Sequence, residues 1–91
     1  MPVLVEIPHA ISRYSDEQTA VEIPGATVGE VLDVLWERFP KLKSRVLDQA
    51  GSFHPYLLLF QNGRKLSRSG FQTLPVHDGD RLEIVALAEG G

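Results

Sequence analysis

The sequence predicts an α+β fold: a mixed sheet of four to five strands with one main helix across one face. Three observations lead to this prediction. Apolar and polar residues alternate as in a β-strand near both ends of the sequence. Apolar residues recur at helical spacing within residues 27–39, and an Asn-Gly pair in the second half is typical of a hairpin turn. With 91 residues, of which 43% are apolar and 23% charged, the chain suits one small domain.

Composition excludes several classes of function. The net charge of −3 means that the chain has no excess of basic residues, so we expect no nucleic-acid partner. Cysteine is absent, which leaves no disulfide framework, no thiolate metal site and no side-chain thiol that could carry sulfur. The start of the chain lacks the features of a signal peptide, and no apolar run approaches the roughly 20 residues of a membrane span. We therefore expect a cytoplasmic protein with no membrane contact.

Two strands are predicted before the helix. Residues 3–7 alternate between apolar side chains for a buried face and a more polar set, and Pro8 closes the strand. Residues 9–17 are polar and rich in turn formers, so we expect an irregular segment there. A second strand follows at residues 19–23 and ends at Pro24.

The helix has the strongest local signal in the chain. Thr27 is the expected N-cap, and Glu30 follows at the spacing of a capping box. Pro40 ends the helix, and residues 41–47 are expected to add another turn or two. The core-facing stripe of the main helix consists of Val28, Val31, Leu32, Leu35, Trp36 and Phe39.

The second half predicts a hairpin. Residues 48–55 have the composition of a loop, and residues 56–60 form an unbroken apolar run of strand length. The pair Asn62-Gly63 favours a type I′ turn, after which a short return strand begins at residues 65–66.

The chain closes with a turn at residues 77–80 and a last strand at residues 81–86. A ferredoxin-like fold would need a second helix before that strand, and residues 67–76 are a poor candidate. The order of elements therefore favours the β-grasp, with a domain at residues 1–86 and a tail at residues 87–91.

These features together resemble the ThiS/MoaD family of ubiquitin-like sulfur carriers. The resemblance covers nearly the whole chain and is strongest at its end, where Leu-Pro-Val-His-Asp-Gly-Asp-Arg-Leu-Glu-Ile (residues 74–84) leads to Gly90-Gly91. The chain departs from the family in residues 86–89, Ala-Leu-Ala-Glu, where prolines and a valine-alanine pair are common.

The resemblance implies a carrier rather than an enzyme. Gly91 would be the reacting residue: its carboxylate is adenylated and then converted to a thiocarboxylate, so that AMP and sulfur are attached only transiently and no cofactor is bound permanently. The implied partners are a ubiquitin-activating-type (MoeB/ThiF-type) adenylyltransferase, a sulfur donor such as a cysteine desulfurase or a rhodanese, and a sulfur-accepting synthase. A further alternative is a small subunit that both carries sulfur and docks permanently on such a synthase.

The tail suits this chemistry physically. The five residues after Ala86 can extend about 16–18 Å, enough to enter an enclosed active site while the domain stays outside. Gly90 and Gly91 lack Cβ atoms, so their backbone can pass a narrow channel.

A partner surface is predicted beside the tail. Residues 56–60 are apolar on both faces of their strand, so one face is left to meet a partner or to be covered by residues 9–17. The expected partner-binding residues are Phe60, Val85, Leu87, Ala88 and Glu89.

The remaining polar motifs favour structural interpretations. The turn at residues 77–80 has the composition of a glycine-centred turn, and we predict no metal site there. His9 and His54 are isolated in loops, and no carboxylate or nucleophile follows either at a spacing typical of a catalytic site, so we expect solvent-exposed loop histidines. A small basic cluster is expected to be a solvated face, with docking to an acidic partner as the alternative; it consists of Arg64, Lys65 and Arg68.

Two other classes of function compete with the sulfur carrier. One is a protein modifier joined to target lysines through Gly91, which shares the activation step. The other is a non-covalent interaction domain, which predicts that deletion of the tail leaves function intact. The sulfur acceptor stays open among cofactor, tRNA and amino-acid biosynthesis.

Overall fold

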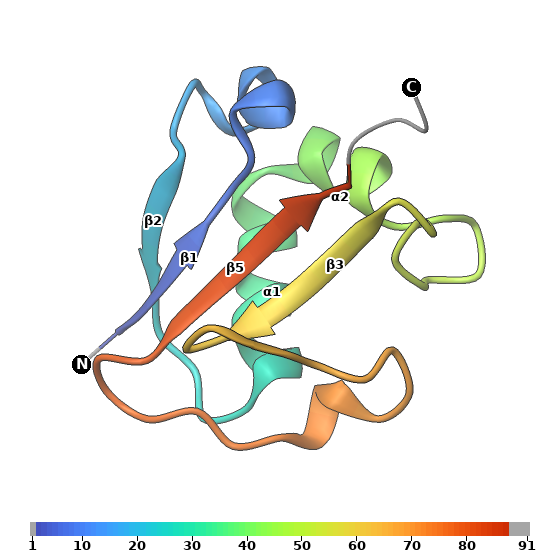
Figure 1. The fold of residues 1–91 in the computed structure, drawn as a ribbon. Helices are drawn as coiled ribbons and strands as arrows, with labels where there is room; N and C mark the ends of the chain where they lie inside the picture. Colours follow the sequence, from blue (N-terminus) through green and yellow to red (C-terminus); the bar gives the residue numbers. More distant parts are fainter. Residues whose placement is uncertain (1, 88–91) are drawn as a thin grey trace.

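The computed structural model, which describes residues 2–87, confirms the predicted β-grasp: a five-stranded mixed sheet with the main helix across one face (Figure 1). The order across the sheet is β2-β1-β5-β3-β4, with β1 and β5 parallel and the other neighbours antiparallel. The elements along the chain are β1 (Val3–Glu6), η1 (His9–Ser15), β2 (Ala20–Ile23), α1 (Val28–Arg38), α2 (Pro40–Val46), β3 (Leu57–Gln61), β4 (Arg64–Lys65), η2 (Phe71–Thr73) and β5 (Arg81–Ala86).

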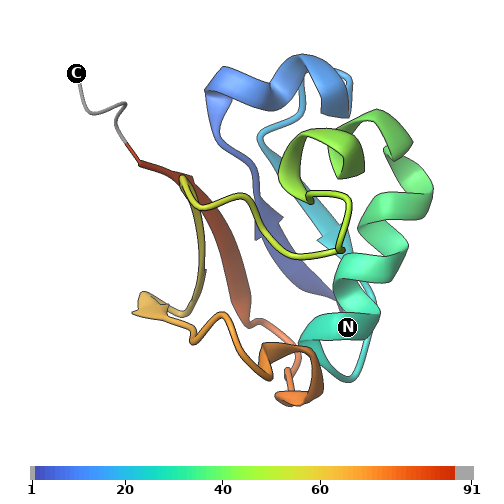
Figure 2. The same cartoon turned by 90° about the vertical axis from the view of Figure 1, so that its right-hand side faces the viewer.

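The sheet separates the molecule into a covered and an open side. Viewed along its edge, all the helices lie on one side of the sheet (Figure 2). On that side Val5 of β1 is paired with Leu82 of β5, and Leu59 of β3 is paired with Ile84 of β5; all four are buried. Because side chains alternate along a strand, their sequence neighbours must face the open side.

Helix α1 begins as predicted. The N–H of Glu30 donates to Thr27 Oγ1 at 3.1 Å, and Glu30 Oε1 accepts from the N–H of Ala26 at 2.9 Å. These two bonds satisfy backbone donors that a helix start leaves without partners. The predicted second helical segment is also present as α2, which starts at Pro40, where the missing N–H costs nothing.

Two 3₁₀ helices replace segments predicted to be irregular. In η1, Ser12 Oγ donates to the carbonyl of His9 at 2.8 Å, and Ser15 Oγ donates to the carbonyl of Gln18 at 2.7 Å. Both serines are buried, so these local bonds satisfy their hydroxyls in the interior. Serine gives the same bonds in turns, which is why composition predicted a loop here.

The hairpin between β3 and β4 has the predicted turn. Asn62 and Gly63 have φ angles of 51° and 84°, and a type I′ turn requires positive φ at both central residues. The return strand is β4 at Arg64–Lys65, one residue earlier than predicted. Across residues 2–87, no helix is both long enough and apolar enough to cross a membrane.

Candidate functional site

The tail leaves the domain at one corner of the sheet. The last strand, β5, ends with Ala86 opposite Leu57 of β3. One residue further, the N–H of Leu87 donates to the carbonyl of Tyr56 at 2.8 Å, and the Leu87 side chain is 48% exposed. The predicted site residues Ala88, Glu89, Gly90 and Gly91 lie outside the described residues. Of the predicted tail, the structure therefore describes Leu87, which we call the root of the tail.

The open side of the sheet carries the side chains predicted to meet a partner. Val85 of β5 is paired with Leu58 of β3, and Phe60 follows two residues later on the same face. All three side chains are half-buried, whereas their neighbours Leu59 and Ile84 are fully in the core. We call the surface formed by Leu58, Phe60 and Val85 the open-face patch.

Residues 9–17, the segment that the sequence offered as a cover for this face, do not cover it. The segment at residues 9–17 folds as η1 and packs against α2, on the helical side of the sheet. Leu58 was not singled out from the sequence, although the alternation within residues 56–60 places it on the same face as Phe60.

An aromatic pair stands beside the root of the tail. The rings of His54 and Tyr56 stack with centroids 5.3 Å apart and planes 12° apart. Tyr56 is 48% exposed and its carbonyl holds Leu87. His54 was expected to be an isolated loop residue, because the sequence did not show that the segment folds back along the end of β5.

One member of the predicted basic cluster has an internal structural role. The guanidinium of Arg68 donates to the carbonyls of Phe53, His54, Pro55 and Leu57 at 3.1, 3.3, 2.8 and 2.8 Å. This fork holds the segment that leads into β3 and therefore supports Tyr56, on which the tail is anchored. All three cations of the cluster are exposed, and Arg68 is the member whose guanidinium donates to these four carbonyls.

The turn before β5 is held by Asp80. Its carboxylate accepts from the backbone N–H of His77 at 2.8 Å, from Asn62 Nδ2 at 3.1 Å and from Gln61 Nε2 at 3.4 Å. These hydrogen bonds, that from His77 foremost, hold the pKa of Asp80 below its ordinary value because they favour the charged form. Within residues 2–87, no three histidine, aspartate or glutamate side chains gather closely enough to hold a metal ion.

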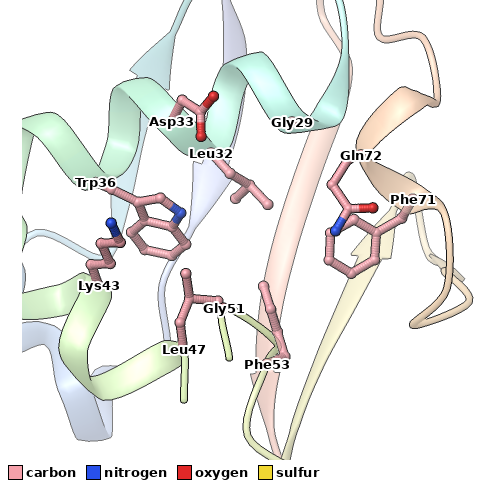
Figure 3. A pocket seen from close by; sticks show the side chains of 10 residues that line it. All are labelled: Gly29, Leu32, Asp33, Trp36, Lys43, Leu47, Gly51, Phe53, Phe71 and Gln72. Atoms are coloured by element: carbon pink, nitrogen blue, oxygen red, sulfur yellow. The ribbon is translucent and has the colours of Figure 1, made fainter. Parts of the chain in front are cut away.

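A separate apolar pocket lies on the helical side of the sheet (Figure 3). It has a volume of about 240 Å³, and Trp36 of α1, Phe53 and Phe71 supply its aromatic walls. Its described lining contains no serine, cysteine or histidine, so it holds no hydroxyl or thiol nucleophile beside a histidine base; Asp33 and Lys43 are its charged members. The root of the tail and the open-face patch are therefore the better candidates for the functional site.

The five-stranded mixed sheet with its helices on one side defines a ubiquitin-like β-grasp protein. The ThiS family model matches residues 5–91, so the chain belongs to the ThiS family. This confirms the resemblance found in the sequence. The family is one of sulfur carriers rather than catalysts.

Individual relatives agree with this assignment. The chain is 27% identical over 93 residues to the sulfur carrier protein CysO of Mycobacterium tuberculosis, with all of both chains covered. A crystal structure of the Amycolatopsis orientalis BexX/CysO complex contains a chain that is 30% identical; the match covers 98% of this chain and 99% of that one, with a TM-score of 0.84. Small archaeal modifier protein 1 of Haloferax volcanii shares the fold over the full length of both chains, with a TM-score of 0.83 at 22% identity.

Proposed function

We propose that this chain is a sulfur carrier whose Gly91 carboxylate is adenylated by a partner enzyme and then converted to a thiocarboxylate. The observation that carries the proposal is the position of the tail root. In this member of the ThiS family, β5 ends at a corner of the sheet beside the half-buried open-face patch, and the sequence after it runs to Gly90-Gly91. A partner can bind the patch and receive the tail at the same time.

The chemistry explains why the chain end must be activated. A carboxylate is a poor electrophile, because its charge repels nucleophiles and oxide is a poor leaving group. Attack of a Gly91 oxygen on the α-phosphorus of ATP releases pyrophosphate and leaves an acyl adenylate. The outer sulfur of a persulfide on a sulfur donor, such as a cysteine desulfurase or a rhodanese, then attacks the carbonyl carbon, and AMP departs as the leaving group. A second thiol attacks the donor's sulfur in the resulting acyl disulfide, so that the S–S bond breaks, a disulfide forms on the donor side and the thiocarboxylate is released. The thiocarboxylate sulfur is anionic at neutral pH and can pass to an acceptor on a synthase.

The open-face patch has the properties of a docking site for the adenylyltransferase. Leu58, Phe60 and Val85 contribute apolar area on a rigid sheet, and Tyr56 and Leu87 extend this area to the root of the tail. That a related CysO chain is found in a BexX/CysO complex supports a mode of action through protein partners. Because the chemistry consumes ATP, we place it in the cytoplasm.

Two variants test the roles of the open-face patch and of the tail independently. Phe60→Ala is expected to raise the KM for adenylation with little effect on kcat, since docking area is lost and the reacting atoms are unchanged. Deletion of Gly91 is expected to abolish adenylation with the domain still folded. Higher-mass conjugates that depend on Gly91 and appear in place of a thiocarboxylate would instead establish a protein modifier.

A further inference from the structure

Within residues 2–87, one carboxylate in the docking region has no ion-pair partner. Glu83 of β5 lies in the register between Glu6 of β1 on one side and Phe60 of β3 on the other, so all three side chains share the open face. Glu83 is half-buried. Among residues 2–87, Arg81 Nε pairs with Glu6 Oε1 at 3.4 Å, and no cation lies within ion-pair distance of Glu83.

This arrangement sets two carboxylates next to each other on one face of the sheet. Neighbouring strands are about 4.8 Å apart, so Glu6 and Glu83 are two like charges held side by side. Arg81 forms its ion pair with Glu6 rather than with Glu83. Lys65 lies across Phe60 in the same row and forms no ion pair with Glu83. Residues that break a local rule in this way are expected at functional sites.

Docking would make the unpaired charge more costly. Glu83 adjoins Phe60 across the strand pair and Val85 along its own strand, so a partner that covers the open-face patch also removes water from this carboxylate. Desolvation of a carboxylate is expensive unless a cation with good hydrogen-bonding geometry replaces the water. A partner without such a cation would be rejected at this position.

We infer that the protein that binds the open-face patch places an arginine or lysine side chain against Glu83, which makes Glu83 a specificity-determining residue for the choice of partner. Arginine suits the position better, because its planar fork can donate two hydrogen bonds to one carboxylate. This inference rests on the proposed function, in which the partner is the adenylyltransferase that activates Gly91.

The inference predicts opposite effects on stability and on recognition. Glu83→Gln removes the repulsion with Glu6, so the unfolding midpoint of the free domain stays equal or rises. The same change removes the partner's counter-charge, so the KM for adenylation rises about tenfold or more with kcat nearly unchanged. Glu83→Lys can pair with Glu6 and should give a larger rise in KM, again without loss of stability.

The experiment measures pyrophosphate exchange with an adenylyltransferase that activates the wild-type chain, at low and at high salt. The wild-type KM is expected to rise with salt, and the Glu83→Gln KM to depend on salt more weakly. The matched control is Glu22→Gln, which makes the same change on the open face but on β2, opposite Leu4. It is expected to leave the KM and its salt dependence unchanged.

The outcomes distinguish this inference from the proposed function. A Glu83→Gln chain that is adenylated with the wild-type KM and salt dependence would overturn the inference and leave the carrier function intact. A fall in the unfolding midpoint that accounts for the lost activity would also overturn it. A wild-type chain that no ubiquitin-activating-type enzyme adenylates would overturn the proposed function, and the inference with it.

Discussion

The four hydrogen bonds of Arg68 predict a large effect from one surface substitution. Arg68→Met keeps most of the aliphatic stem but removes every donor from the carbonyls of Phe53, His54, Pro55 and Leu57. The carbonyls of His54 and Pro55 can turn to water. The bonds to Phe53 and Leu57 are partly buried, so their loss is not fully replaced by solvent.

The magnitude follows from those two bonds. A hydrogen bond from a charged donor contributes about 1.5–3 kcal/mol when buried, and about 1 kcal/mol each is reasonable for partly exposed bonds. The free energy of unfolding should therefore fall by about 2 kcal/mol. In a domain of this size that corresponds to a decrease in Tm of roughly 8–16 °C.

The assay is denaturant and thermal unfolding of Arg68→Met beside Arg64→Met. Arg64 is exposed on the neighbouring β4, so the control makes the same chemical change away from the fork. Amide hydrogen exchange should also become faster at Leu57 and Leu87, because Arg68 holds the segment that anchors the root of the tail. Equal midpoints for the two variants, with unchanged exchange at Leu57 and Leu87, would refute the structural role assigned to Arg68.

Three further predictions concern the turn, the helix and the tail. Asp80→Asn should lower stability at neutral pH and flatten its decrease in acid, as measured by unfolding over a pH series. Because the pKa of Asp80 is lowered in the folded state, its contribution to the free energy of unfolding is fully present above the ordinary pKa of about 3.9 and is lost as pH falls through the folded-state pKa. An unchanged dependence of stability on acid pH in Asp80→Asn would contradict this. Gly29→Ala should destabilise the domain by about 1 kcal/mol in urea unfolding, although alanine favours helices, because a Cβ there would meet the carbonyl oxygen of Gln72 at 2.9 Å; a gain in stability would show that η2 moves freely. Gly90→Val should abolish adenylation with the unfolding midpoint unchanged, and normal adenylation of this variant would exclude a narrow channel for the tail.

Local rules in the sequence were sufficient for the main elements. The capping box of Thr27 and Glu30 and the apolar stripe behind it placed α1, and Asn62-Gly63 identified the hairpin turn, because each signal lies within a few residues. The helix η1 was missed because its buried serines satisfy themselves with local bonds that also occur in turns.

The candidate site was predicted only in part. Alternation alone placed Phe60 and Val85 on the open face, and the register adds Leu58 opposite Val85. The pairing of Glu6 with Glu83 in the sheet register could not be predicted, since it depends on the parallel alignment of the first and last strands. The fork of Arg68 likewise depends on how two loops meet, for which neither loop carries a sequence signal.

The central claim is that Gly91 carries sulfur, and intact mass tests it most directly. The purified chain is incubated with MgATP, a sulfur source and a candidate adenylyltransferase, beside the same chain lacking Gly91. The account predicts a mass gain equal to the exchange of one oxygen for sulfur in the full chain and none in the truncated one. An unchanged mass with every such enzyme, together with function that survives removal of the tail, would contradict it and indicate a non-covalent binding domain.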